Sequence, residues 1–325
     1  MIITRSPLRI TLGGGGTDLP SYYHQHGGFC ISAAIDKYVY VTVLRPFVPG
    51  IYLKYSEIEH VDCVDNVKHP IIREAIRLMD LKTPQLEITT LTDIPAGTGL
   101  GSSSSFTTAL LKAICAHRRR FLHPANLAEI ACKIEIDILA NPIGKQDQYI
   151  ATFGGVMCLT FMNDSVVVRP LDAPIETLFA LEDNLLLFFT GYARQASDVL
   201  RDQQTRTETN DLDMLANLHQ VKVLARETQC ALQQGDLTAF GQLLHEQWEL
   251  KKRRLGAATN PHIDEWYTRG LANGAIGGKL VGAGGGGFLL FYTTEHQQLR
   301  ASMIAAGLEE VRFRFDYEGT KVLLS

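Results

Sequence analysis

The spacing of hydrophobic residues along this chain changes repeatedly between the period of a strand and the period of a helix. Short runs rich in β-branched and aromatic residues are typical of strands. They predict strands over residues 30–35, 38–44, 51–55, 86–91, 154–161, 165–169, 185–190 and 288–292. Apolar residues at helical spacing predict helices over about 70–79, 106–116, 124–140, 197–234, 237–254 and 261–273. Pro142 and Gly144 are expected to end the third of these helices.

Strands and helices are mixed along the whole chain, which predicts an α+β or α/β class with two lobes. Asn163-Asp164 lies between two apolar runs and predicts the turn of a hairpin. The composition changes near residues 174–183, so we place the boundary between the lobes there. The chain has 325 residues, which is enough for one large domain or two ordinary ones.

Composition and charge indicate a globular protein and give no signal for nucleic-acid or membrane binding. Hydrophobic residues make up 46% of the chain and charged residues 20%, as in a folded globular enzyme, and the net charge of -4 gives no general reason to expect nucleic-acid binding. We interpret the basic runs at 118–120 and 251–254 as solvated charges near helix ends. The cysteines include no Cys-x-x-Cys pair, which indicates free thiols. No signal-peptide pattern or membrane-length apolar run is present, so we expect a cytoplasmic protein without a membrane partner.

The segment from Pro95 to Ser105 combines glycines and serines between a predicted strand and a predicted helix. Glycines allow a tight loop, serines supply hydroxyl groups, and the N-terminus of the helix offers unpaired N–H groups and the positive end of its dipole. These features are those of a phosphate-binding loop. The segment is not a Walker A motif, because no lysine occurs between Pro95 and Lys112.

Two further glycine clusters lie at 13–16 and 282–287. The second contains a formal GxGxxG pattern, which in a dinucleotide-binding fold stands between a strand and a helix. Here the apolar run at 288–292 follows it and predicts a strand. The glycines therefore indicate a strand-loop-strand turn where backbone approaches a ligand or another segment.

The glycine-containing segments 7–18, 95–105 and 282–287 resemble, in order, motifs one, two and three of the GHMP kinases. The runs 5–18 and 141–149 are most similar to the D-glycero-D-manno-heptose 7-phosphate kinases of that family. The resemblance implies an α+β fold of two domains, with a ribosomal-protein-S5-like domain over 1–178 and a ferredoxin-like domain over 179–325. It also implies an active site between the domains and ATP-dependent phosphorylation of an anomeric sugar hydroxyl to give a 1,7-bisphosphate.

The resemblance assigns roles to particular residues of this chain. It implies that Asp147 acts on the sugar hydroxyl and that Arg9 pairs with it and neutralises charge on the phosphoryl group. Ser103 and Glu135 match the residues that hold Mg²⁺, an ion that prefers oxygen ligands. The loop expected to bind ATP comprises Pro95, Gly97, Gly99, Leu100, Gly101, Ser102, Ser103 and Ser104. The residues expected to contact the sugar are Gly15, Gly16, Thr17, Asp18, Gly284 and Gly285.

The chain departs from galactokinases at one position that concerns the substrate. Where those enzymes have Glu-His before Thr-Asp, this chain has Gly15-Gly16, which removes two sugar contacts and opens space. A larger, already phosphorylated sugar would fit that space, and its phosphate would need cations. The candidates are Lys37, Arg45, Lys145, Arg194, Lys251 and Lys279, among which the sequence does not choose.

Other functions stay open at this point. A 1-kinase for a sugar without a phosphate, such as fucose or galactose, would belong to the same family. A sugar sensor would keep the fold without catalysis, although a sensor has no need of Asp147, Arg9 and Glu135. A dinucleotide oxidoreductase would use the last glycine cluster. The sequence leaves the oligomeric state open, a homodimer included.

Overall fold

The computed structural model describes residues 1–81, 85–192, 197–255, 260–282, 284 and 286–325. In these ranges the first of two sheets has the strand order β12-β1-β2-β5-β3-β4, and β6 and β7 extend it from β2. β3 and β5 pair in parallel, whereas the other neighbours pair antiparallel. The strands are β1 (Ile2–Gly13), β2 (Gly28–Leu44), β3 (Gly50–Lys54), β4 (Ile58–Val61), β5 (Gln85–Thr92), β6 (Val156–Phe161), β7 (Val166–Pro170) and β12 (Lys321–Leu324). The pairing of β6 with β7 confirms the hairpin expected at Asn163-Asp164.

The long strand β2 corrects the expectation of two separate strands over 30–35 and 38–44. Leu8 of β1 opposes Ile35 while Pro7 opposes Tyr38, so a bulge absorbs the two residues between Ile35 and Tyr38. The strand on the other side of β2 changes there from β6 to β5. The sequence did not predict β1 as a strand, because most of its residues are buried and it lacks an alternating pattern.

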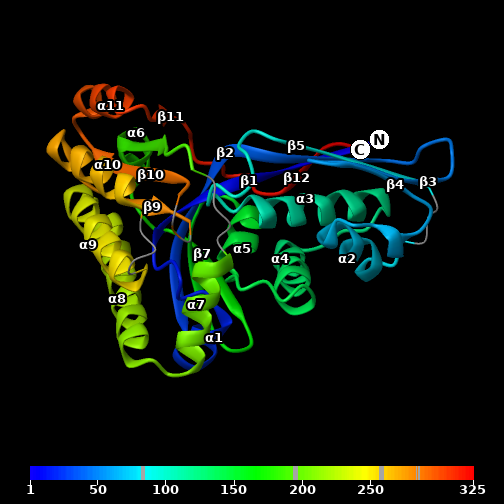
Figure 1. Ribbon diagram of the computed structural model, residues 1–325, viewed down its shortest axis with the longest axis horizontal. Helices are drawn as coiled ribbons and strands as arrows, with labels where there is room; N and C mark the ends of the chain where they lie inside the picture. Colours follow the sequence, from blue (N-terminus) through cyan, green and yellow to red (C-terminus); the bar gives the residue numbers. More distant parts are fainter. Residues whose placement is uncertain (82–84, 193–196, 256–259, 283, 285) are drawn as a thin grey trace.

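Helices cover one face of this sheet below the strands in Figure 1. They are α2 (Pro70–Leu78), α3 (Ser102–His117), α4 (Pro124–Cys132) and α5 (Gln146–Phe153), while α1 (Pro20–His26) follows β1 and the 3₁₀ turn η1 (Val64–Asn66) precedes α2. The helix predicted over 124–140 is α4 followed by a π-helical turn, η2 (Lys133–Ile138). Asp147 lies in the first turn of α5, a helix of eight residues that is too short to show a clear helical period in the sequence.

The second sheet and most of its helices lie at the left end of Figure 1, while α7 lies beside α1; the strand order is β11-β8-β10-β9 in the described part of the chain. Its strands are β8 (Leu185–Phe189), β9 (Ala275–Val281), β10 (Phe288–Thr293) and β11 (Glu309–Glu310). Its helices are α6 (Ile175–Asn184), α7 (Ser197–Glu208), α8 (Leu212–Gln234), α9 (Leu237–Leu255), α10 (Pro261–Ala272) and α11 (His296–Ala305). The single helix predicted over 197–234 is wrong, because Asn210 has a φ of 55° and the side chain of Asp211 caps a new helix.

The third glycine cluster joins β9 to β10, which pair antiparallel, so the predicted strand-loop-strand turn is confirmed. The last strand, β12, returns to the first sheet and pairs with β1, which brings the two chain ends close together (Figure 1). The domain boundary between residues 178 and 179 stays a prediction.

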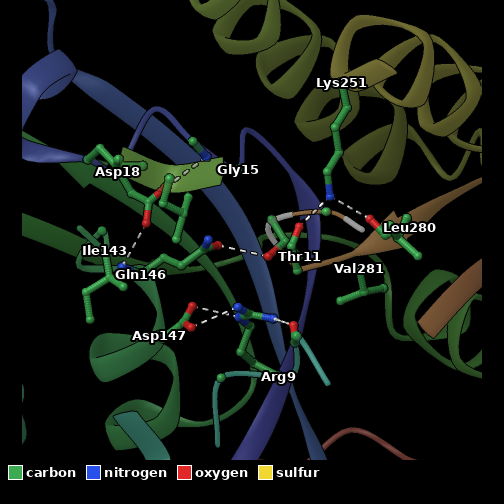
Figure 2. Close-up of a pocket in the computed structure, with 18 of the residues that line it drawn as sticks. Arg9, Thr11, Gly15, Asp18, Ile143, Gln146, Asp147, Lys251, Leu280 and Val281 are labelled. Atoms are coloured by element: carbon green, nitrogen blue, oxygen red, sulfur yellow. Dashed lines mark hydrogen bonds and ion pairs between the residues drawn. The ribbon is translucent and has the colours of Figure 1, made fainter. Parts of the chain in front are cut away.

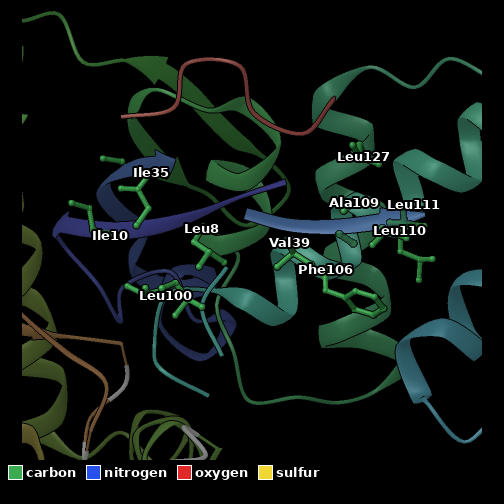
Figure 3. Packing of buried hydrophobic residues seen from close by; sticks show 14 of the residues in the cluster. Leu8, Ile10, Ile35, Val39, Leu100, Phe106, Ala109, Leu110, Leu111 and Leu127 are labelled. Carbon is green, nitrogen blue, oxygen red and sulfur yellow. The ribbon is translucent and has the colours of Figure 1, made fainter. Parts of the chain in front are cut away.

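A cluster of buried hydrophobic residues extends from the first sheet into the second. It includes Leu8 and Leu100 near the first glycine loop and Leu187 and Leu290 in the second sheet. Figure 3 shows how α3 contributes Leu110 and its neighbours to the part of this cluster next to β1 and β2. The two lobes therefore share one core, and their relative position is fixed by apolar packing.

We predict that Leu110→Ala destabilises the protein by about 2–5 kcal/mol, because it leaves a cavity in this shared core. Leu110 has 0% of its surface exposed, whereas Leu91 on β5 is 66% exposed. Leu91→Ala is therefore the control, with an expected loss below about 1 kcal/mol. Urea unfolding of both variants measures the difference, and equal losses would contradict a core role for Leu110.

Candidate active site

The first glycine loop lies at the start of α3, as predicted. Gly97, Gly99 and Gly101 all have positive φ angles, of 79°, 85° and 78°, so the loop has a path that other residues adopt only with strain. These glycines and Ser102 to Ser104 line a pocket. The N-terminus of α3 thus presents backbone N–H groups to the pocket.

Two residues of the predicted ATP loop do not place their side chains in the pocket. The side chain of Leu100 is fully buried in the core, so only its backbone is available near the pocket. Its carbonyl oxygen accepts a hydrogen bond from the Arg9 backbone N–H at 3.0 Å. Pro95 is exposed and does not line the pocket.

The third glycine cluster packs directly against the first loop. A Cβ atom on Gly282 would lie 2.6 Å from the Cα of Gly99, and one on Gly99 would lie 2.8 Å from the carbonyl oxygen of Val281. Glycine at both positions is what allows the two backbones to approach. Gly282 and Gly284 line the same pocket as the first loop, whereas Gly285 lies outside the described residues.

Arg9 and Asp147 form a bidentate ion pair at the pocket wall (Figure 2). Arg9 Nε lies 2.7 Å from Asp147 Oδ1, and Nη2 lies 2.8 Å from Oδ2. The remaining nitrogen, Nη1, donates to the carbonyl oxygen of Gly99 at 2.6 Å. A carboxylate oxygen can accept more than one hydrogen bond, so Asp147 keeps acceptor capacity toward the pocket. The predicted pairing of these two residues is present in the structure.

Asp18 lines the pocket but is only 2% exposed. Its Oδ1 accepts from the backbone N–H of Gly16 at 2.9 Å, and its Oδ2 accepts from that of Gln146 at 3.3 Å. Burial, and then the charge of Asp147, raise the pKa of Asp18, although these backbone bonds oppose the shift. A Cβ atom on Gly144 would lie 1.9 Å from Oδ2, so glycine is required there.

The other residues around Asp18 differ in their exposure to the pocket. Gly15 and Gly16 line it, and Gly16 has a φ of 101°. Thr17 is fully buried behind them, and its hydroxyl donates to the carbonyl oxygens of Gly14 and Phe29 at 2.9 and 3.0 Å. Thr17 therefore stabilises the turn that carries Asp18.

Ser103 and Glu135 are in direct contact. The Ser103 hydroxyl donates to Glu135 Oε1 at 2.6 Å, and Gln148 Nε2 donates to Oε2 at 2.9 Å. Ser103 lines the pocket, while Glu135 lies fully buried behind it, and this burial raises the pKa of Glu135. A hydroxyl and a carboxylate are oxygen ligands of the kind that Mg²⁺ accepts. The described residues hold no group of three or more His, Cys, Asp or Glu arranged for a metal, so substrate and water would have to complete its shell.

Cations from the second lobe face the same pocket. Lys251 and Arg254 lie on α9 and Lys279 lies on β9, and all line the pocket. Lys251 donates to the carbonyl oxygens of Leu280, at 2.9 Å, and Gly282. Lys279 lies 3.3 Å from Gln247 Oε1. Within the described parts of the chain, none of these cations forms an ion pair with a carboxylate.

Burial lowers the pKa of each of these cations, to about 7 for Lys279, to about 10 for Arg254 and well below the usual value for Lys251. The interpretation of 251–254 as a solvated run does not hold for Lys251 and Arg254, which are only partly exposed and line the pocket. It suits Lys252, which pairs with Glu249 at 2.6 Å. Of the other candidate cations, Lys37, Arg45 and Lys145 do not line the pocket, and Arg194 lies outside the described residues.

Two family models match the chain. The model described as the GHMP kinases N terminal domain matches residues 70–155, and the model described as GHMP kinases C terminal matches residues 230–307. The chain belongs to the GHMP kinase family. The predicted fold class is confirmed, and the antiparallel strands around the last glycine cluster give no support to a dinucleotide-binding site.

Among the relatives of this GHMP kinase, the D-glycero-alpha-D-manno-heptose 7-phosphate kinase of Campylobacter jejuni is 30% identical over 98% of both chains. The L-fucokinase/L-fucose-1-P guanylyltransferase of Bacteroides fragilis is 29% identical over 90% of this chain and 34% of its own length. The crystal structure of a D-glycero-D-manno-heptose 1-phosphate kinase from Bacteroides thetaiotaomicron has a TM-score of 0.80 and 27% identity, and the match covers 100% of this chain and 99% of that one.

These relatives identify the GHMP kinase as an ATP-dependent phosphotransferase with an alcohol acceptor, of the sugar kinase type. The pocket joins the residues that such chemistry needs: a glycine loop at a helix N-terminus, a paired carboxylate and a group of cations. Within the described ranges, no helix is both long enough and apolar enough to cross a membrane.

Proposed function

We propose that this GHMP kinase phosphorylates the anomeric hydroxyl of D-glycero-D-manno-heptose 7-phosphate to give the 1,7-bisphosphate. The observation that carries the proposal is the group formed by Lys251, Arg254 and Lys279 in the pocket that also contains Asp147. Lys279 is buried and the other two are partly buried, and in the described part of the chain none of the three pairs with a carboxylate, which favours an anionic ligand. The glycine loop accounts for the phosphates of ATP, so this second group supports a sugar that already carries a phosphate.

The names of two relatives agree on a heptose as the sugar but differ in the position of the phosphate. The Campylobacter jejuni relative is named for heptose 7-phosphate, and the Bacteroides thetaiotaomicron structure is named a heptose 1-phosphate kinase. The Bacteroides fragilis relative is named a fucokinase, which supports a free sugar as the second candidate substrate. The cation group favours the phosphorylated sugar over the free one.

In the proposed reaction the anomeric hydroxyl donates a hydrogen bond to Asp147. Its oxygen forms the bond to the γ-phosphorus, the bond to the ADP oxygen breaks, and the hydroxyl proton passes to Asp147. Arg9 holds Asp147 in place and compensates its negative charge near the phosphates. Mg²⁺ held by Ser103 and Glu135 would neutralise charge on the nucleotide phosphates.

Asp147→Asn is expected to lower kcat by about a hundredfold or more, because the amide keeps the shape of the side chain but cannot take the proton. The KM for ATP should change little. Asp137, an exposed carboxylate of η2, provides the matched control Asp137→Asn with normal turnover. A normal kcat in Asp147→Asn would remove this residue from the mechanism.

Ser103→Ala and Glu135→Gln are expected to raise the Mg²⁺ concentration required for half the maximal rate, because each removes an oxygen ligand or its charge. Titration of Mg²⁺ at saturating ATP measures the shift. Asp137→Asn, which changes an exposed carboxylate on the same π-helical turn as Glu135, is the control. Unchanged Mg²⁺ curves in both variants would show that the ion is held by other groups.

The wild-type enzyme should use heptose 7-phosphate at least about tenfold better in kcat/KM than the same heptose without phosphate, the effect of a charge-assisted contact of about 1.5–3 kcal/mol. Lys279→Met should remove most of this preference by lowering kcat/KM for the phosphorylated sugar alone. Because burial lowers the pKa of Lys279 to about 7, its part of the preference should decrease as the pH rises above 7.

Lys252→Met, on the same helix as Lys251 but paired with Glu249, is the control for the loss of a nearby charge. It should keep the full preference for the phosphorylated sugar. Equal kcat/KM for heptose and heptose 7-phosphate in the wild type would contradict the proposal and leave a 1-kinase for free sugars as the better description.

A further inference from the structure

Gln146 is a pocket residue whose side chain has no role in the reaction described above. It is the first residue of α5, next to Asp147, and it lines the pocket although it is only 9% exposed. Figure 2 shows its amide group between Asp18 and the Arg9–Asp147 pair. Its backbone N–H donates to Asp18, so the residue is fixed at both its main chain and its side chain.

The amide orientation of Gln146 is set by two hydroxyl groups of the first sheet. Thr11 Oγ1 and Ser32 Oγ each donate to Gln146 Oε1 at 2.9 Å. Thr11 on β1 and Ser32 on β2 are direct partners in the strand ladder, which makes this support rigid. With Oε1 held by the sheet, the amide nitrogen Nε2 is directed to the other side.

In the described part of the chain, no protein acceptor bonds to Gln146 Nε2. A Cβ atom on Gly15 would lie 4.0 Å from this nitrogen, so the donor lies beside the space that Gly15 leaves open. The nitrogen is therefore open to the pocket, and a ligand oxygen that accepts its hydrogen bond as the site closes to water would gain affinity. The amide of Gln146 thus holds an N–H donor in position for a ligand atom that accepts a hydrogen bond.

The chemistry around Nε2 indicates which ligand atom this is. Two polar groups lie close to an anomeric carbon. The ring oxygen only accepts hydrogen bonds, whereas the 2-hydroxyl on the neighbouring carbon both donates and accepts them. Asp18 provides an acceptor 3.3 Å from the backbone nitrogen of Gln146, so a donor and an acceptor face the pocket together. This combination matches a hydroxyl group.

We propose that Gln146 is a specificity-determining residue that donates a hydrogen bond from Nε2 to the 2-hydroxyl of the sugar, while Asp18 accepts a hydrogen bond from that hydroxyl. This inference rests on the proposed function, because the sugar is placed by its anomeric hydroxyl at Asp147. Thr11 and Ser32 are positioning residues that act through the Gln146 amide. The enzyme then distinguishes sugars by the presence and configuration of the 2-hydroxyl.

The test is a cycle of two enzymes and two substrates: wild type and Gln146→Met, each assayed with heptose 7-phosphate and its 2-deoxy analogue. The wild type should lose about tenfold or more in kcat/KM on the 2-deoxy analogue, because removal of the hydroxyl leaves buried polar groups unpaired. Gln146→Met should lose a similar factor on the parent sugar and only a little more on the analogue. The KM for ATP should not change.

Thr11→Val, which keeps the Gln146 amide but removes one of its supports, should give an intermediate loss on the parent sugar. If Gln146→Met does not fold, Gln146→Glu replaces it in the cycle, because it keeps an acceptor for Thr11 and Ser32 but has no N–H donor. A full 2-deoxy penalty in the Gln146 variant would overturn the inference and leave the proposed function intact. No turnover of heptose 7-phosphate by the wild type would overturn the proposed function, and the inference with it.

Discussion

The guanidinium group of Arg9 connects two parts of the active site that are far apart in the sequence, the carboxylate on α5 and the first glycine loop. It contacts both carboxylate oxygens of Asp147 on α5 and the carbonyl oxygen of Gly99 in the first glycine loop. A Cβ atom on Gly101 would lie 3.1 Å from Asp147 Oδ2, so the loop passes directly beside the pair. Because a partly buried carboxylate needs a cation, the position of Asp147 depends on the strand that carries Arg9.

The second lobe contacts the first glycine loop at positions where both segments have glycine. The close approach of Gly282 to Gly99 and the shared hydrophobic core hold β9 against the first glycine loop. The same contact places Lys251 and Lys279 in the pocket of Asp147. Burial lowers the pKa of both lysines, which means that their positive charge is unfavourable in this pocket and that an anionic ligand would stabilise it.

The site has two kinds of wall with different chemistry. The first glycine loop and the N-terminus of α3 offer backbone N–H groups, which suit phosphates of any length. The part of the pocket around Asp18 and Gln146 presents side-chain groups that are fixed by hydrogen bonds to strands β1 and β2 or to the turn before α1. Rigid polar groups distinguish between similar sugars because a missing partner leaves them unpaired.

By itself, the sequence determined the local features that depend on a few neighbouring residues: the glycine loops, the hairpin near Asn163 and the strand-loop-strand turn near Gly282. Glycines and serines at a helix start carry their chemistry locally. The pairing of Arg9 with Asp147, which the structure contains, followed from the resemblance to the GHMP kinases and from no local pattern. Only the tertiary structure decided that Lys251 faces the pocket while Lys252, one residue away, faces Glu249, and that Gln146 presents a free donor. These outcomes depend on which face of a helix packs against a distant strand, and contacts between distant segments leave no local pattern.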